Sequence, residues 1–110
     1  MIGLRGYIDR NGNQRFANWF EGLDASAAAK VTLALTRVEQ GNFSNAKGVG
    51  AGVYEFKIDF GPGYRIYFGK DGDRLVILIG GGTKKRQKKD IEAAQECWAD
   101  YKRRKKQETP

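Results

Sequence analysis

The chain has 110 residues, 40% of them hydrophobic, a length and composition that fit one folded domain, residues 1–110, and exclude a disordered chain. Twenty basic and thirteen acidic residues give a formal net charge of +7, which favours a polyanion or an acidic partner. There is no histidine, and Cys97 is the single cysteine. These counts argue against a zinc site, an internal disulfide and a histidine-activated nucleophile, and we expect no metal or other cofactor.

Cys97 lies at the spacing of a helix core, so we expect it to be a packing residue in a reducing compartment. No segment reaches the ~18 apolar residues of a membrane span, and the N-terminus carries no signal-peptide pattern. The sequence therefore predicts a cytoplasmic protein without membrane contact.

The first forty residues predict one strand and two helices. Ile2, Leu4 and Ile8 occupy alternate positions of a strand over 2–8. A turn at 10–13 supplies an asparagine to cap a short helix, whose apolar stripe consists of Phe16, Trp19, Phe20 and Leu23. Asp24 or Ser26 can cap a second helix, which Gly41 ends in a left-handed conformation. The short connection predicts a helical hairpin.

A β-hairpin follows the polar loop 42–52. Residues 53–60 alternate between apolar and charged side chains, 61–63 form a turn, and 64–69 alternate again. We expect Phe60 to pair with Tyr64, which sets Asp59 opposite Arg65. One open sheet face then carries Glu55, Lys57, Arg65 and Tyr67.

The last third predicts a turn at 70–73, a central strand over 75–79 and a final helix capped by Thr83. That helix buries Ile91, Ala94, Trp98 and Tyr101. The glycines at 80–82 lack the pattern of a phosphate-binding loop, and tight strand-to-helix packing explains them better. The order β-α-α-β-β-β-α is an α+β fold with a small, mainly antiparallel sheet.

Positive charge is concentrated near the C-terminus, where residues 84–110 hold ten basic and five acidic side chains. Lys84 and Lys85 leave the central strand and are expected near Arg65, where cations could bind a phosphate. The charged residues of the hairpin could equally form ordinary cross-strand ion pairs. Residues 102–110 are either a salt-sensitive RNA contact or a frayed basic end.

Two segments resemble a known family. Residues 54–67, with the G-P-G-Y-R turn, are similar to the central hairpin of RelE/ParE toxins. Residues 77–91, with G-G-x-K-x-x-Q-x-x-D, are similar to the HigB-like "addiction module killer" branch. The resemblance implies a type II toxin–antitoxin toxin that acts as an mRNA interferase, an endoribonuclease expected to cut on the ribosome.

The resemblance also implies a chemistry and a set of residues. The ribose 2′-hydroxyl attacks the adjacent phosphorus without a metal, which leaves a 2′,3′-cyclic phosphate and needs a base, an acid and cations. By position, Lys57 matches a base or charge stabiliser, Arg65 the phosphate-contacting arginine, and Lys84 or Lys85 a further basic residue. Glu55 is a second candidate base. Further RNA contacts are assigned to Tyr67, Arg86, Lys88, Lys89, Lys102, Arg103 and Arg104.

The implied partners are mRNA, the ribosome and an antitoxin, a small helix-turn-helix protein from the adjacent gene that alone would bind operator DNA. Two other functions stay open at this stage. One is a ParE-like, non-catalytic inhibitor of DNA gyrase or another topoisomerase, although a pure binder needs no convergent cations. The other is a basic nucleic-acid-binding module or a toxin that has lost activity. The arrangement of Lys57, Arg65 and Lys84 discriminates among them.

Overall fold

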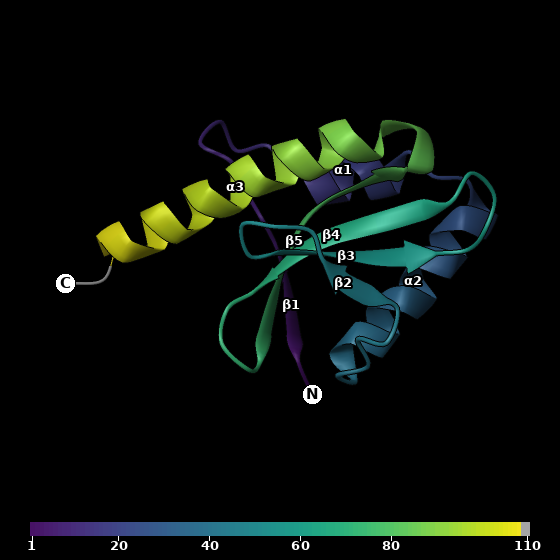
Figure 1. The fold of residues 1–110 in the computed structure, drawn as a ribbon, viewed down its shortest axis with the longest axis horizontal. Coiled ribbons are helices and arrows are strands. Elements are labelled where there is room, and N and C mark those ends of the chain that lie inside the picture. The colour runs from purple at the N-terminus through teal and green to yellow at the C-terminus, as the bar shows by residue number, and fades with distance from the viewer. Residues whose placement is uncertain (109–110) are drawn as a thin grey trace.

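Five strands form one mixed sheet in the order β1-β5-β4-β3-β2, and three α-helices cover it (Figure 1). The computed structural model describes residues 1–108. In chain order the elements are β1 (Gly3–Gly6), α1 (Arg15–Glu21), α2 (Ala25–Glu39), β2 (Ala46–Gly48), β3 (Val53–Ile58), β4 (Tyr64–Lys70), β5 (Leu75–Thr83), a 3-10 turn (Lys84–Arg86) and α3 (Gln87–Glu108). The predicted α+β class and mainly antiparallel sheet are confirmed.

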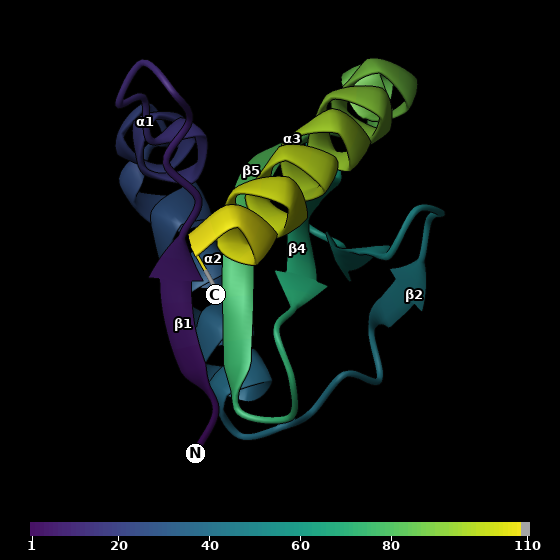
Figure 2. The same ribbon diagram turned by 90° about the vertical axis from the view of Figure 1, so that its left-hand side faces the viewer.

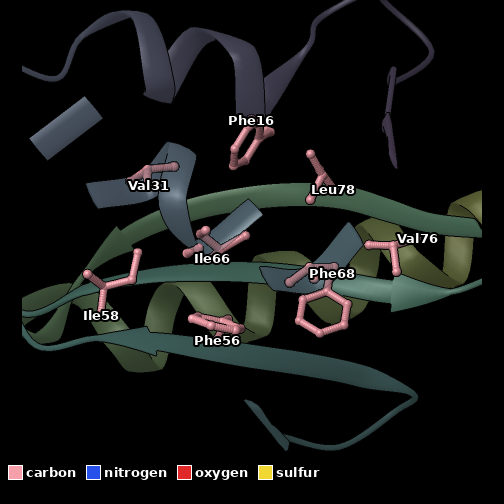
Figure 3. Close-up of a cluster of buried hydrophobic side chains, with 10 residues drawn as sticks. Phe16, Val31, Phe56, Ile58, Ile66, Phe68, Val76 and Leu78 are labelled. Atoms are coloured by element: carbon pink, nitrogen blue, oxygen red, sulfur yellow. The ribbon is translucent and has the colours of Figure 1, made fainter. Parts of the chain in front are cut away.

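Helices α1 and α2 pack on one sheet face, and α3 crosses the other (Figure 2). The core between α1, α2 and the sheet is apolar because strands β3, β4 and β5 each direct alternate side chains toward it. Figure 3 shows this cluster, which includes Phe16, Val31, Phe56, Ile58, Ile66, Phe68, Val76 and Leu78.

The face under α3 carries a second apolar cluster, which includes Val53, Tyr67, Ile77, Ile79, Ala94 and Trp98. Ile91, Cys97 and Tyr101 pack against it, so the predicted stripe of the last helix and the packing role of Cys97 are confirmed. Burial raises the pKa of the Cys97 thiol, as expected for a packing residue. No helix within residues 1–108 is both long enough and apolar enough to cross a bilayer.

The central position predicted for 75–79 is also confirmed. Strand β5 pairs antiparallel with β4 and parallel with β1, and its apolar side chains enter both cores. Its register with β4 shifts at Tyr67 and Phe68, where a bulge lets the strand continue beyond Ile79.

Strand β5 runs through Gly80–Gly82 to Thr83, so the predicted end of this strand at Ile79 was wrong. Helix packing explains two of these glycines. A Cβ on Gly81 would lie 2.3 Å from the Trp19 ring, and one on Gly82 would lie 1.9 Å from Asp90 Oδ2. The glycines therefore allow side chains from α1 and α3 to approach the strand backbone, as the packing interpretation predicted.

The hairpin register differs by two residues from the prediction. Ile58 pairs with Tyr64 and Lys57 pairs with Arg65, which leaves residues 59–63 as the connection. A shift of two keeps every side chain on its predicted face, because the side-chain period of a strand is two. The predicted pairs were wrong, but the predicted faces were right. The segment 42–52, expected to be a loop, contains the short strand β2 paired with β3.

The helix ends differ in part from expectation. The Asp24 carboxylate accepts the Ala27 N–H at 2.8 Å and caps α2, and Gly41 follows that helix with φ +78°, as predicted. Asn13 does not cap α1: the N-cap residue is Gln14, which makes no side-chain cap hydrogen bond, and the Asn13 backbone N–H donates to Asp9 in the preceding turn. Thr83 likewise makes no side-chain cap, and α3 begins only at Gln87.

The first strand is shorter than predicted and ends at Gly6. Ile2 and Leu4 pack against the core as expected, whereas Ile8 is exposed. Tyr7 is buried instead, because its hydroxyl donates to Asp100 of α3 at 2.6 Å and draws the chain toward that helix.

Candidate active site

The turn between β3 and β4 brings Arg65 and Lys84 to one point. Arg65 Nη1 donates to the Gly63 carbonyl at 2.6 Å, and the Lys84 backbone N–H donates to the same oxygen at 3.0 Å. Gly63 has φ +78°, and a Cβ there would lie 3.0 Å from Arg65 Nη1. Glycine is therefore required both by the backbone and by the arginine. The sequence prediction that these two residues lie together is confirmed.

Lys57 completes this group from the neighbouring strand. It pairs directly with Arg65 across β3 and β4, so both side chains leave the sheet on the face that α3 covers. Their exposure differs greatly: the Lys57 side chain is 54% exposed and the Arg65 side chain 6%. Lys57 Nζ lies 3.5 Å from Asp59 at the start of the turn. The site thus has one exposed cation and one buried cation.

Glu55 lies beside Arg65 with only 1% of its side chain exposed. Gln87 Nε2, from the first turn of α3, donates to Glu55 Oε1 at 3.1 Å and to Oε2 at 2.9 Å. Arg65 Nε is 3.8 Å and Lys47 Nζ is 3.9 Å from Oε1. A buried carboxylate is tolerated only when it is paired and hydrogen-bonded. Here β2, β4 and α3 supply the partners.

Two further acidic or phenolic groups lie under the start of α3. Tyr67 pairs with Glu55 across the strands and is 1% exposed. Burial raises the pKa of its hydroxyl, and the nearby Glu55 charge raises it further. Burial also raises the pKa of the Asp90 carboxyl. Within residues 1–108, the Tyr67 hydroxyl, Asp90 Oδ2 and Arg65 Nε are buried and lack a hydrogen bond.

The expected open sheet face is therefore wrong for three of its four side chains. Glu55, Arg65 and Tyr67 are buried, and Lys57 alone is exposed. The reason is that α3, which follows β5 after the 3-10 turn, lies over this face (Figure 1). The apolar stripe of the helix did not reveal how far it covers the sheet. Tyr67, assigned to RNA contact, has no accessible surface for that role in this conformation.

Three residues of the group were absent from the sequence prediction: Lys47, Gln87 and Asp90. Gln87 and Asp90 stand in the G-G-x-K-x-x-Q-x-x-D stretch, so the motif contained the signal although no role had been assigned to them. Lys47 lies in the unpredicted strand β2, and nothing in its local sequence pointed to Glu55.

A row of exposed cations extends from the site along the start of α3. It consists of Lys84, Lys85, Arg86, Lys88 and Lys89, called here the basic row. Within residues 1–108 none of them forms an ion pair with an acidic side chain. The helix dipole disfavours cations at a helix N-terminus, so this arrangement costs stability unless an anion binds.

The second predicted basic segment is held differently. Helix α3 continues to Glu108, and Thr109 and Pro110 lie outside the described residues. Arg104 Nη2 is 2.9 Å from Asp100 Oδ2, and Lys105 contacts Asp71. Arg103 also pairs with Asp100, at 3.5 Å, whereas Lys102 is exposed beside the Trp98 ring. Asp100 and Asp71 thus pair with three of the five basic side chains in 102–106.

The arrangement can bind an anion without a metal. Arg65 carries the planar group that suits a phosphate, and two exposed lysines, Lys57 across the strands and Lys84 at the turn, are its neighbours. Within residues 1–108, no three His, Cys, Asp or Glu side chains are grouped as a metal site would require.

Comparison with known proteins places the chain in a family. Residues 18–99 match the family described as "Phage derived protein Gp49-like (DUF891)". The chain belongs to the Gp49-like family. A Haemophilus influenzae protein, itself uncharacterized, is 41% identical over 80 residues, which cover 72% of this chain and 81% of the relative. The Gp49-like family is of the toxin–antitoxin type and is similar to RelE and HigB toxins. The match includes the hairpin, the basic row and most of α3.

Proposed function

We propose that this protein is the toxin of a type II toxin–antitoxin system, a RelE/ParE-type mRNA interferase that cuts RNA without a metal. The observation that carries the proposal is that three basic residues, Lys57, Arg65 and Lys84, meet at one turn. Lys57 is the cross-strand partner of Arg65, and Arg65 and Lys84 share the Gly63 carbonyl. Phosphate esters are the ligands best matched by an arginine fork flanked by lysines.

The basic row supports a polyanionic ligand. Its five cations, which form no ion pair within residues 1–108, lie in the 3-10 turn and the first turn of α3. They repel one another and oppose the helix dipole, so stability alone does not explain them. An RNA strand would neutralise them, and binding would release counterions. The row continues directly from Lys84, so a strand whose phosphate lies at Arg65 can follow it along α3.

The reaction we propose is transesterification. The 2′-oxygen forms a bond to the adjacent phosphorus, the bond from phosphorus to the 5′-oxygen breaks, and the products are a 2′,3′-cyclic phosphate and a 5′-hydroxyl. Arg65 stabilises the charge that develops on the phosphate oxygens. Lys57, whose side chain is 54% exposed, is the base that we propose for the 2′-hydroxyl proton. Lys84 or Lys85 donates a proton to the departing 5′-oxygen.

The family type implies a neutralising antitoxin, and we propose that it is a small helix-turn-helix protein encoded by the neighbouring gene. Operator DNA would then be bound through the antitoxin. We also propose that the mRNA is cut on the ribosome in the cytoplasm, where the basic row and the Lys102 side would face ribosomal RNA.

The test is to express the protein in bacteria and map mRNA ends by primer extension. We expect new mRNA ends with the wild type and none with Arg65→Ala. The control variant Arg74→Ala should give the same new ends as the wild type. Arg74 is an exposed cation at the β4–β5 turn, the opposite end of the hairpin from Gly63. With purified protein, cleavage should continue in a metal chelator and leave cyclic phosphate ends.

Growth arrest with intact mRNA and with DNA-damage signalling would overturn the proposal and indicate a topoisomerase poison. Cleavage that continues in Arg65→Ala would contradict the site rather than the activity.

A further inference from the structure

The second candidate base, Glu55, is closed off from any substrate. A general base must come within about 2.6–3.2 Å of the proton that it removes. Both Glu55 oxygens accept from Gln87 Nε2, the Arg65 and Lys47 cations lie beside Oε1, and 1% of the side chain is exposed. A ribose could reach this carboxylate only after the first turn of α3 had moved away.

Arg65 is held at two of its three guanidinium nitrogens. Nη1 donates to the Gly63 carbonyl, and Nε faces Glu55 Oε1 at 3.8 Å. Because Nη1 is bonded to Gly63 and Nε faces Glu55, Nη2 is the nitrogen that is left for a ligand.

We propose that Glu55 is a positioning residue for Arg65, and that Gln87 acts through Glu55 by fixing the rotation of its carboxylate. This inference rests on the proposed function, because the ligand for which Arg65 is positioned is the scissile phosphate. In this arrangement Glu55 holds the Nε edge of the guanidinium and Gly63 holds Nη1. Nη2 is thereby directed outward, next to Lys57 and Lys84.

The charge balance agrees with this role. A buried arginine is stable only beside a counter-charge, and Glu55 is the acidic partner that Arg65 contacts within residues 1–108. An arginine fixed in advance loses less conformational freedom when it binds a phosphate. The first turn of α3 thus contributes to phosphate binding through Gln87, although Gln87 itself does not reach the ligand.

The test compares Glu55→Gln and Gln87→Leu with Glu92→Gln, which removes an exposed carboxylate from the same helix as Gln87. Binding of a 2′-deoxy RNA analogue, which cannot be cut, is measured by fluorescence anisotropy. We expect Glu55→Gln, which removes the charge 3.8 Å from Arg65 Nε, and Gln87→Leu, which removes both hydrogen bonds to Glu55, each to weaken binding by about 10- to 100-fold. Glu92→Gln should bind as the wild type does.

Kinetics separate positioning from base catalysis. If Glu55 positions Arg65, Glu55→Gln lowers kcat/KM but keeps the shape of the pH profile, and it adds little once Arg65→Ala is present. If Glu55 is the base, Glu55→Gln loses the acidic limb of the pH profile and leaves analogue binding unchanged. Its effect on kcat/KM then multiplies with the effect of Arg65→Ala. That second set of results would overturn the inference.

A readout independent of activity is the ¹H–¹⁵N resonance of Arg65 Nε in the folded protein. It should shift in Glu55→Gln and in Gln87→Leu, and stay in place in Glu92→Gln. Unchanged resonances in folded variants would refute the positioning contact. If the resonance shifts but the wild type neither binds nor cuts RNA, the proposed function fails while the contact itself stands. Thermal unfolding by circular dichroism shows whether each variant is folded.

Discussion

Gly81→Ala tests whether the glycines of β5 are needed for helix side chains to pack against the strand backbone. A Cβ on Gly81 would lie 2.3 Å from Trp19 Cε3 and 2.4 Å from Cδ2, whereas real carbon contacts have their optimum near ~3.5–4.0 Å. The indole is held in place by Phe16 at 5.7 Å and Tyr64 at 6.4 Å between ring centroids. To admit one methyl group, the ring must therefore move by more than an ångström and disturb the core under α1.

The expected cost follows from two opposing effects. Overpacking of a well-packed core costs about 1–3 kcal/mol. Replacing glycine restricts the unfolded chain and returns roughly 0.4–1 kcal/mol. The net effect on the free energy of unfolding is a loss of about 1–2 kcal/mol, which lowers the Tm of a chain of this size by roughly 4–10 °C.

Gly80→Ala is the matched control, because Gly80 is the adjacent residue of the same strand and no atom lies within 4 Å of its Cβ position. Urea and thermal unfolding of both variants should show a loss for Gly81→Ala and no loss for Gly80→Ala. Equal stability of the two would refute the packing explanation. If both variants bound RNA more weakly at unchanged stability, the glycines at 80–82 would instead be part of a phosphate-binding segment.

Three further predictions concern charge. Lys84→Ala should weaken RNA binding and reduce the slope of log K against log salt by about 0.7 in magnitude, whereas Arg74→Ala should leave the slope unchanged. Asp100→Asn should destabilise the fold by about 1–3 kcal/mol at pH 7, because the Tyr7 hydrogen bond lowers the pKa of Asp100. The stability that the ionised Asp100 carboxylate contributes is present above the ordinary carboxyl pKa and is lost as the pH falls through the lowered pKa of Asp100. In urea unfolding, the difference in stability between wild type and Asp100→Asn should therefore vanish in acid. Asp90→Asn should have the opposite sign: burial raises the pKa of Asp90, so its charge costs stability above that pKa, and the variant should gain Tm at pH 7 but not in acid.

Much of the fold could be predicted from periodicity. The alternation over 53–60, the apolar run 75–79 and the stripe ending at Tyr101 each place their residues on the faces that the structure shows. Register was harder, because pairing Phe60 or Ile58 with Tyr64 buries the same faces, and the turn geometry decides between them. The strand through Gly80–Gly82 escaped prediction because its residues have no side chains to show a period.

The candidate site could be predicted only in its cations. Lys57, Arg65 and Lys84 were expected together because a hairpin and the following strand end at one place, and pairing confirms it. The burial of Arg65 and Glu55 depends on how far α3 covers the sheet, which is a tertiary property. The Gln87 contact with Glu55 joins residues 32 positions apart, and strand alternation carries no information about it.

The polar layer under α3 is where the chain departs from the packing rules that it follows elsewhere. Within residues 1–108, four buried side-chain polar atoms lack a hydrogen bond, and three of them belong to Arg65, Tyr67 and Asp90. Each such atom costs free energy that an apolar side chain of similar shape would not. Natural sequences accept such costs mainly where function requires the polar group. Arg65, one of the three, also contacts the Gly63 carbonyl at the turn that Lys84 reaches, so we expect a variant that stabilises this layer by removing its polar groups to lose activity.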